Sequence, residues 1–357
     1  MKDHATSLTR YRLHRYLVAS YVLFIIYASL SPFTGWQEQG LYFIDMLTAP
    51  LAQTFTWFDA ILNSLAYMPL GFLLVYMLRN RLPVSFVLLV STLTGLLLSI
   101  SMEFSQLYLP TRVSSNSDLL SNSIGTFCGT VLALSIAKYS WLEHVEQWQE
   151  KWLHHGKYSD FGLALLALWM FAQTNPSLPM LGSVFIGAAA RWPFDIVQPV
   201  PFNWQECAGV SLNLVLLGIL LSTLLRDRRN TVNGMLLVLC AVTLAKFLAA
   251  AVLLKSWALF LWMNSEAMFG IFAGLLLLMA AVRLPRSWQL GIGAVSSVYY
   301  LLLVQNLLFG TPSSAVMRLY HWHYVHMLNY NGLSKFIILL FPVLLLAYLV
   351  RTGMNRK

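Results

Sequence analysis

Polar residues that could bind a ligand or transfer a proton gather beside three apolar runs of this chain. Carboxylates, amides and one guanidinium occur together, and most are spaced three or four residues apart, so that on a helix the members of each pair share one face. A carboxylate can accept a proton or an amine, whereas a guanidinium suits a phosphate or a carboxylate. The set consists of Asp59, Asn63, Glu103, Gln106, Arg112, Asp118 and Asn122.

The composition of the chain indicates a membrane protein. Hydrophobic residues make up 58% of the 357 positions and charged residues only 10%, which leaves too few polar side chains to cover a soluble globule. Apolar runs of about 18 to 20 residues, long enough to cross a bilayer as a helix, recur along the sequence. The alternation typical of a β-barrel is missing. We therefore predict an all-α fold, a polytopic transmembrane helical bundle.

Ten membrane spans are predicted from these runs. A Gly-rich apolar piece at 182–190 is too short to span, and we expect it, within the segment 178–203, to be re-entrant or interfacial. The predicted spans are 16–33, 60–78, 83–102, 118–137, 160–177, 207–225, 232–253, 257–281, 288–309 and 335–350.

The basic residues predict how the ten spans are oriented. Lys and Arg accumulate in short loops on the cytoplasmic side of a membrane, and in this arrangement most of them fall on one face together with both termini. The termini are therefore predicted to be cytoplasmic. The formal net charge of +9 is explained by this topology and implies no nucleic-acid partner.

With this orientation the seven polar residues meet at the outer surface of the membrane. Glu103 and Gln106 end the third span, and Arg112 follows in a short outer loop. The other two pairs begin the second and fourth spans, which start on the same side. The prediction is one outward-facing pocket of acids, amides and an arginine. Below it, Gly125 and Gly129 form a GxxxG step that would let a neighbouring helix approach closely.

The motifs around these residues follow a fixed order. They are D-x3-N at 59–63, PLG at 69–71, Arg79, E-x2-Q at 103–106, P-x-R at 110–112 and D-x3-N-x2-G-x3-G at 118–129. This ordered set, within residues 16–138, resembles the VanZ-like family. The resemblance implies an integral protein of the bacterial cell envelope, in the cytoplasmic (inner) membrane. The family is named for a member linked to resistance to the glycopeptide teicoplanin, and the resemblance implies no established reaction.

Three regions are predicted along the chain. Residues 1–140 form a VanZ-like four-helix membrane domain, residues 141–159 an amphipathic linker at the cytoplasmic interface, and residues 160–357 a C-terminal region of six helices. Residues 55–81 align with 202–228 at a constant offset of 147, which sets Asp59 against Glu206. The C-terminal region is therefore hypothesised to be an eroded repeat, and equivalent helix packing would support this.

Several functions compete for the polar pocket. In the first, the pocket binds or acts on a lipid-linked or cell-wall intermediate, with membrane lipids as further partners and with Glu103 and Asp118 as catalytic acid or base. In the second, the carboxylates carry a proton or cation in a transporter. A non-catalytic scaffold for envelope assembly, or a purely structural ion-pair cluster, is the remaining alternative. Enzymatic turnover and oligomeric state stay open. The binding residues of the first function would be Asp59, Asn63, Gln106, Arg112 and Asn122.

Neither a metal nor a cofactor is predicted. Three carboxylates near one arginine could hold a hard cation, but no spacing in the sequence demands one. The histidines of HWHYVH at 321–326 stand among aromatic residues typical of a membrane interface and match no common zinc pattern. Cys128, Cys207 and Cys240 lack paired spacing and are expected to be small core residues.

A structural ion pair is predicted between Lys246 and Glu266. Lys246 lies in the middle of the seventh span, where an ammonium without a partner would be costly. Glu266 in the eighth span would lie at a similar depth and is the candidate partner. The alternative is that Lys246 extends towards an interface while Glu266 lies in an outer loop.

Overall fold

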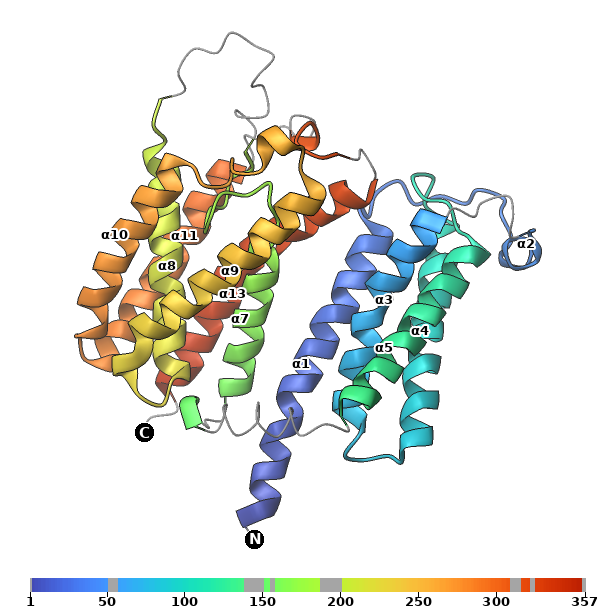
Figure 1. Ribbon diagram of the computed structural model, residues 1–357, viewed down its shortest axis with the longest axis horizontal. Coiled ribbons are helices and arrows are strands. Elements are labelled where there is room, and N and C mark those ends of the chain that lie inside the picture. The colour runs from blue at the N-terminus through green and yellow to red at the C-terminus, as the bar shows by residue number, and fades with distance from the viewer. Residues whose placement is uncertain are drawn as a thin grey trace. The chain divides into compact units, whose positions relative to one another are not determined.

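The computed structural model describes residues 2–50, 57–137, 151–154, 158–186, 201–308, 316–321 and 325–354. All the secondary-structure elements named among these residues are helices, as Figure 1 shows. Nine of these helices have the length and apolar composition to cross a membrane. The remaining predicted span, 160–177, corresponds to α7 (Ser159–Gln173), which has only 15 residues. The all-α, multi-pass architecture is confirmed, and the side of the membrane on which the termini lie stays a prediction.

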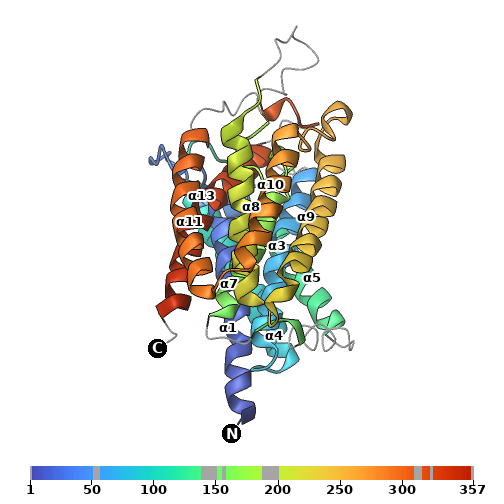
Figure 2. The same ribbon diagram turned by 90° about the vertical axis from the view of Figure 1, so that its left-hand side faces the viewer.

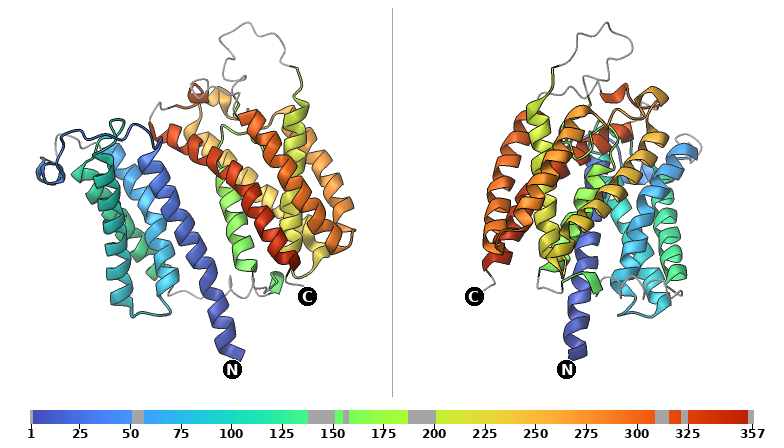
Figure 3. Two further views of the ribbon diagram at one scale, coloured as in Figure 1. Left: turned by 180° about the vertical axis from the view of Figure 1, so that it is seen from behind. Right: turned by 60° about the vertical axis from the view of Figure 1, so that its left-hand side comes forward.

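The chain divides into two compact units, Met1–Gln149 and Glu150–Lys357. In unit 1, α3 packs most extensively on α5, α4 packs on α5, and α1 packs on α3, as Figure 3 shows from behind. A hydrophobic core that includes Tyr67, Leu70 and Met102 fills the space between α1, α3 and α4. The helices of unit 1 are α1 (Lys2–Leu30), α2 (Phe43–Thr48), α3 (Trp57–Leu78), α4 (Val84–Gln106) and α5 (Asn116–Ile136).

Glycines bring α3 and α5 into close contact. A Cβ at Gly125 would overlap the main-chain oxygen of Ser64, and a Cβ at Gly129 would overlap that of Met68. From the other side, a Cβ at Gly71 would overlap the main chain of α5. The close approach predicted from the GxxxG step is therefore confirmed, and α3 is the helix that approaches.

Unit 2 is built around α8. Nearly all of this helix is buried, and it contacts α10, α11, α9 and α7, an arrangement visible in Figure 2. Helix α13 packs on α11 and α7. The helices of unit 2 are α7, α8 (Trp204–Leu224), η3 (Arg228–Asn230), α9 (Thr231–Leu253), η4 (Ser256–Ala258), α10 (Ser265–Val282), α11 (Arg286–Leu308) and α13 (Val325–Met354).

The chain that follows α7 is irregular and buried. Helix α7 ends at Gln173, and residues 174–186 form turns without a helix while nearly all of them are buried. The main chain of Met180 donates a hydrogen bond to the Trp262 oxygen, and that of Ile186 donates to the Ser177 oxygen. This stretch contains residues 178–186 of the segment 178–203 expected to be re-entrant; residues 187–200 lie outside the described part.

The helices of the two units correspond in sequence position. A shift of 147 residues carries the first residue of α3 onto the first of α8, and both ends of α4 onto both ends of α9. Ser64 Oγ donates to the oxygen of Ser121 at 3.0 Å, and Ser211 Oγ donates to the oxygen of Gly270 at 2.9 Å. Ser121 and Gly270 are each the sixth residue of their helix, α5 and α10. These matches support the hypothesis of a repeat, which stays a prediction.

Parts of two predicted features fall outside the described residues. Most of the expected amphipathic linker (141–159) lies there, namely 141–150 and 155–157, as does the middle of the histidine-rich stretch at 322–324. Of the three cysteines, all free, Cys128 and Cys240 are exposed on their helices. The expectation that these two are core residues is therefore wrong.

Candidate functional site

The predicted polar residues of unit 1 lie at one end of its helices, where α3 and α5 begin and α4 ends. Asp59 and Asp118 occupy the first turns of α3 and α5. Asp118 lies beside the side chains of Asn63 and Ser117, and the charge of Asp59 acts on it. Glu103, in the last turn of α4, is also influenced by the charge of Asp118. Four of the predicted site residues are thus brought together from three helices.

Glu103 holds the loop that leads into α5. Its side chain is only 3% exposed, and its Oε2 accepts hydrogen bonds from the Ser115 amide at 2.8 Å and from Ser114 Oγ at 3.1 Å. Ser115 is the N-cap of α5, and its side chain accepts from the amide of Ser117. Charge-assisted hydrogen bonds of this kind are roughly twice as strong as neutral ones. The Glu103 carboxylate therefore fixes the position at which α5 begins.

Two buried polar atoms near this carboxylate have no hydrogen-bond partner among the described residues: Tyr67 Oη and Asn122 Oδ1. The amide nitrogen of Asn122 donates to Ser99 Oγ at 2.9 Å. Tyr67 Oη lies near Ser99 without a hydrogen bond of good geometry, and it is influenced by the charges of Glu103 and Asp118. An unsatisfied buried acceptor or donor costs about 1–3 kcal/mol, so these two atoms mark a place where a ligand or a water molecule would be stabilised.

Seven residues form what we call the carboxylate cluster: Asp59, Asn63, Tyr67, Ser99, Glu103, Asp118 and Asn122. Asp59, Asn63 and Asp118 are partly exposed, whereas the other four members of the cluster are buried. The cluster therefore has an accessible rim of carboxylates and an amide above a buried polar floor.

Sequence reasoning missed Tyr67 and Ser99. A signal for both was present, because Tyr67 follows Asn63 by four residues and Ser99 precedes Glu103 by four. Residues four apart share a helix face. Extending each predicted pair by one more turn would have added them.

Gln106 and Arg112 make their hydrogen bonds with the C-terminal end of α1. Gln106 Nε2 donates to the Ser29 oxygen at 3.1 Å. The Arg112 guanidinium donates through Nη2 to the oxygens of Ala28 at 3.1 Å and Ser31 at 2.6 Å. Burial lowers the pKa of Arg112 from its ordinary value, but a guanidinium still stays charged. Arg112 thus caps main-chain oxygens at the end of α1.

The chemistry of the carboxylate cluster favours a ligand that donates hydrogen bonds. Carboxylates and the Asn122 oxygen accept, and the Tyr67 hydroxyl can do either. Among the residues that the structure describes, no group of three or more His, Cys, Asp and Glu side chains is arranged to hold a metal ion. The arrangement suits a primary amine or another small cationic group.

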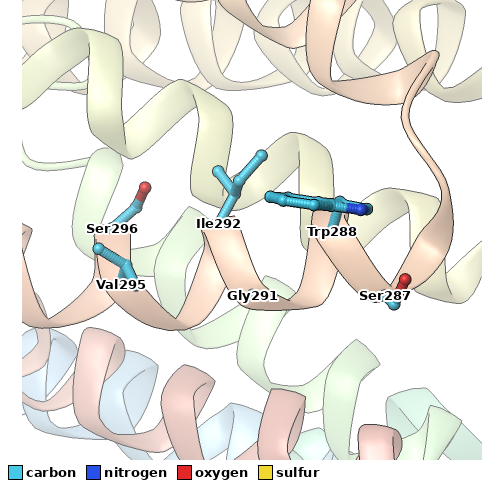
Figure 4. Close-up of a pocket in the computed structure, with 6 residues that line it drawn as sticks. All are labelled: Ser287, Trp288, Gly291, Ile292, Val295 and Ser296. Atoms are coloured by element: carbon cyan, nitrogen blue, oxygen red, sulfur yellow. The ribbon is translucent and has the colours of Figure 1, made fainter.

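Two apolar cavities occur in unit 2. One, about 480 Å³, lies along a face of α11 and is lined by Ser287, Trp288, Gly291, Ile292, Val295 and Ser296, as Figure 4 shows. The other, about 500 Å³, lies between α9 and residues 260–263. Neither contains a predicted site residue, and both occur on helices expected to face lipid.

The structure corrects the predicted ion pair of Lys246 and Glu266. Lys246 Nζ donates to the main-chain oxygens of residues 175 and 178, both at 2.9 Å. Glu266 lies in the first turn of α10 and accepts from the Asn203 amide at 3.2 Å. No ion pair joins these two described residues. The prediction is wrong because α10 begins only at Ser265, after the η4 turn, so Glu266 lies at the end of its helix.

Comparison with known proteins agrees with the motif series. Residues 7–138 match the model of the VanZ/LLP1 family, and the predicted VanZ-like identity of this region is confirmed. The matched region contains the whole carboxylate cluster and ends just after α5. Neither the curated proteins nor the solved structures give a match to the chain. The N-terminal part of this multi-pass membrane protein is therefore VanZ-like.

Proposed function

We propose that the VanZ-like unit binds the amine-bearing head group of a lipid-linked or cell-wall intermediate at the carboxylate cluster. The observation that carries the proposal is the pair of buried, unpartnered atoms, Tyr67 Oη and Asn122 Oδ1, beneath a rim of carboxylates. A protonated amine offers three N–H donors and a charge opposite to that of Asp59 and Asp118. Both properties match what the cluster presents.

The proposal gives the predicted site residues different roles. Asp118 and Asp59, on the partly exposed rim, accept hydrogen bonds from the amine, and Asp118 is the group placed to take a proton from it. Glu103 holds the loop before α5 through Ser114 and Ser115. Gln106 and Arg112 hold the end of α1. The proposal assigns binding, and turnover is not needed for it.

The distribution of basic residues supports placing this site at the outer surface of the bacterial cytoplasmic membrane, where cell-wall intermediates are used. A contribution to glycopeptide resistance would follow only if the bound intermediate were the one that the antibiotic recognises. That link rests on the family resemblance alone and is tested by whether the bound lipid carries a peptide.

Native mass spectrometry of the purified protein tests the proposal. We expect the wild type to retain an amine-bearing lipid and Asp118→Asn to retain it at least about tenfold less, because a hydrogen bond to a charged group contributes about 1.5–3 kcal/mol. Glu266→Gln is the matched control, since it removes a carboxylate from the first turn of a helix in unit 2. Equal lipid retention by all three proteins, or loss in the control as well, would contradict the proposal.

A proton- or cation-coupled transporter is the second candidate function. Its support is the ammonium of Lys246, fully buried in α9 beside an irregular segment of chain, a combination that transporters place at their ion sites. Proteoliposomes that carry a pH-sensitive dye distinguish it. Proton uptake by the wild type that disappears in Lys246→Met would favour transport over head-group binding.

A further inference from the structure

Lys246 is the only charged residue among those described that is 0% exposed. It lies in the interior of α9, seven residues before the end of that helix at Leu253. Its ammonium donates to the main-chain oxygens of Asn175 and Leu178 at 2.9 Å each and of Pro179 at 3.5 Å. Three N–H groups thus meet three neutral carbonyl oxygens.

These oxygens belong to the irregular segment that follows α7. The dipole of a helix adds partial negative charge at its C-terminal end. A cation is therefore stabilised just beyond Gln173, where α7 ends. Main-chain oxygens buried at membrane depth must be satisfied inside the protein, and Lys246 does this for three of them.

Side chains hold the same segment from the other side. Asn175 Oδ1 accepts from the amide and the hydroxyl of Ser177 at 3.0 and 2.7 Å. Asn175 Nδ2 donates to Asn331 Oδ1 at 2.9 Å and to Ser334 Oγ at 3.0 Å, which joins the segment to α13. All four of these polar residues are buried. The carbonyl oxygens around the ammonium are therefore fixed in place by a hydrogen-bonded frame.

We infer that the C-terminal end of α7 and residues 174–179 form a binding site for a small monovalent cation, and that the ammonium of Lys246 fills it. The ligands are neutral oxygens, which suits a single positive charge, whereas divalent ions are usually held with carboxylates. Glu266, the acid predicted to neutralise Lys246, makes its hydrogen bonds with Asn203 and Ser265. The charge is stabilised by main-chain dipoles.

The corresponding position in unit 1 has no cation. The shift of 147 residues carries Ser99 onto Lys246, and Ser99 is a buried hydroxyl that accepts from Asn122. Unit 1 has no irregular buried segment after a short helix at this place, since α1 continues to Leu30. The lysine is thus present in the unit in which the short helix α7 is followed by irregular buried chain.

Chemical rescue of a variant that lacks the Lys246 side chain tests the inference. In the full-length protein, we expect Lys246→Ala to lower the melting temperature by on the order of 10 °C. About 100 mM methylammonium chloride should restore several degrees, because a cation that binds only the folded state stabilises it by mass action. Tetramethylammonium chloride at the same concentration has no N–H or O–H group to donate and should restore nothing. Tryptophan fluorescence on heating gives the melting temperature.

Control variants make the outcome decisive. Lys255→Ala, just beyond the end of α9, should show neither the loss nor the rescue. Lys246→Met fills the space without an N–H and should lose stability that methylammonium does not restore. Equal rescue by tetramethylammonium, or a Lys246→Met protein that melts within about 2 °C of wild type, would overturn the inference. If Lys246→Ala is not recovered folded in any salt, the melting temperature of Lys246→Met relative to wild type decides alone.

Discussion

Units 1 and 2 each contain a central helix pair, and the polar groups beside the two pairs differ, although Gln173 Oε1 in unit 2 is also buried without a hydrogen-bond partner among the described residues. In unit 1, two buried polar atoms beside the carboxylates are left without a partner. In unit 2, Lys246 has three acceptors, and Glu206 accepts from the side chain of Asn264, the N-cap of α10. Satisfied buried groups stabilise a structure, whereas unsatisfied ones cost free energy until something binds. The unpartnered atoms beside the carboxylates support the proposal that unit 1 binds the ligand.

The shared contact itself is made of small residues in both units. A Cβ at Gly125 on α5 would overlap the main chain of Ser64 on α3, and a Cβ at Gly274 on α10 would come within 3.0 Å of the Ser211 oxygen on α8. Ser64 and Ser211 are related by the shift of 147 residues. The polar groups around this contact can therefore differ while the helix pair stays the same.

The largest expected effect breaks the helix pair of unit 1. Gly129→Leu would force a side chain against the Met68 main-chain oxygen, and we expect it to cost more than about 4 kcal/mol in the free energy of unfolding. Gly291→Leu is the control, since no atom lies within 4 Å of the place of its Cβ, and it should change stability by less than about 1 kcal/mol. Unfolding in mixed micelles measures both. Equal losses would show that the α3–α5 contact is loose.

The second prediction compares equivalent positions of the two units. Lys246→Met leaves three buried carbonyl oxygens without a donor and should cost about 3 kcal/mol, whereas Ser99→Ala removes one acceptor and should cost about 1 kcal/mol. The same unfolding measurement applies. A larger loss for Ser99→Ala would reverse the comparison between the units.

The third prediction concerns the loop before α5. Glu103→Ala removes the acceptor of two hydrogen bonds from Ser114 and Ser115 and should destabilise unit 1 by about 2 kcal/mol. Hydrogen exchange of the Ser115 amide should accelerate, because its partner is gone. Glu206→Ala in unit 2, which loses one bond to Asn264, should cost only about 1 kcal/mol. Unchanged protection of the Ser115 amide would show that Glu103 does not hold the loop.

The smallest effect tests the equivalence of the two helix pairs. Ser64→Ala and Ser211→Ala each remove one hydroxyl hydrogen bond to a main-chain oxygen across the pair. Each should cost about 0.5–1 kcal/mol, and the two losses should agree within about 0.5 kcal/mol. A strong effect in one unit and none in the other would weaken the hypothesis of a repeat.

The features that could be predicted from sequence depend on local spacing. The membrane helices follow from long apolar runs, and the α3–α5 contact follows from Gly125 and Gly129, because small residues four apart are needed for close approach. The convergence of Asp59, Glu103 and Asp118 follows from helix ends that meet on one side. Each of these depends on residues within a few turns of one another.

The features that were missed depend on irregular chain or on a single residue type. The partners of Lys246 are main-chain oxygens of residues 175–179, and any residue can supply a carbonyl, so no side-chain pattern marks them. Glu266 was placed too deep because the apolar run before it contains the η4 turn and the Asn264 cap. Tyr67 resembles an ordinary core residue, since tyrosine is common in apolar helices.

The contact of α3 with α5 has a consequence for movement in unit 1. A Cβ at Gly125 or Gly129 would overlap main-chain oxygens of α3, so the two backbones approach closely there. One helix could slide past the other only by a full turn, about 5.4 Å, which would break every such contact at once. We therefore expect the pair to stay together, so that an opening that admits a ligand to the proposed site would come from displacement of α1, α4 or the loop before α5.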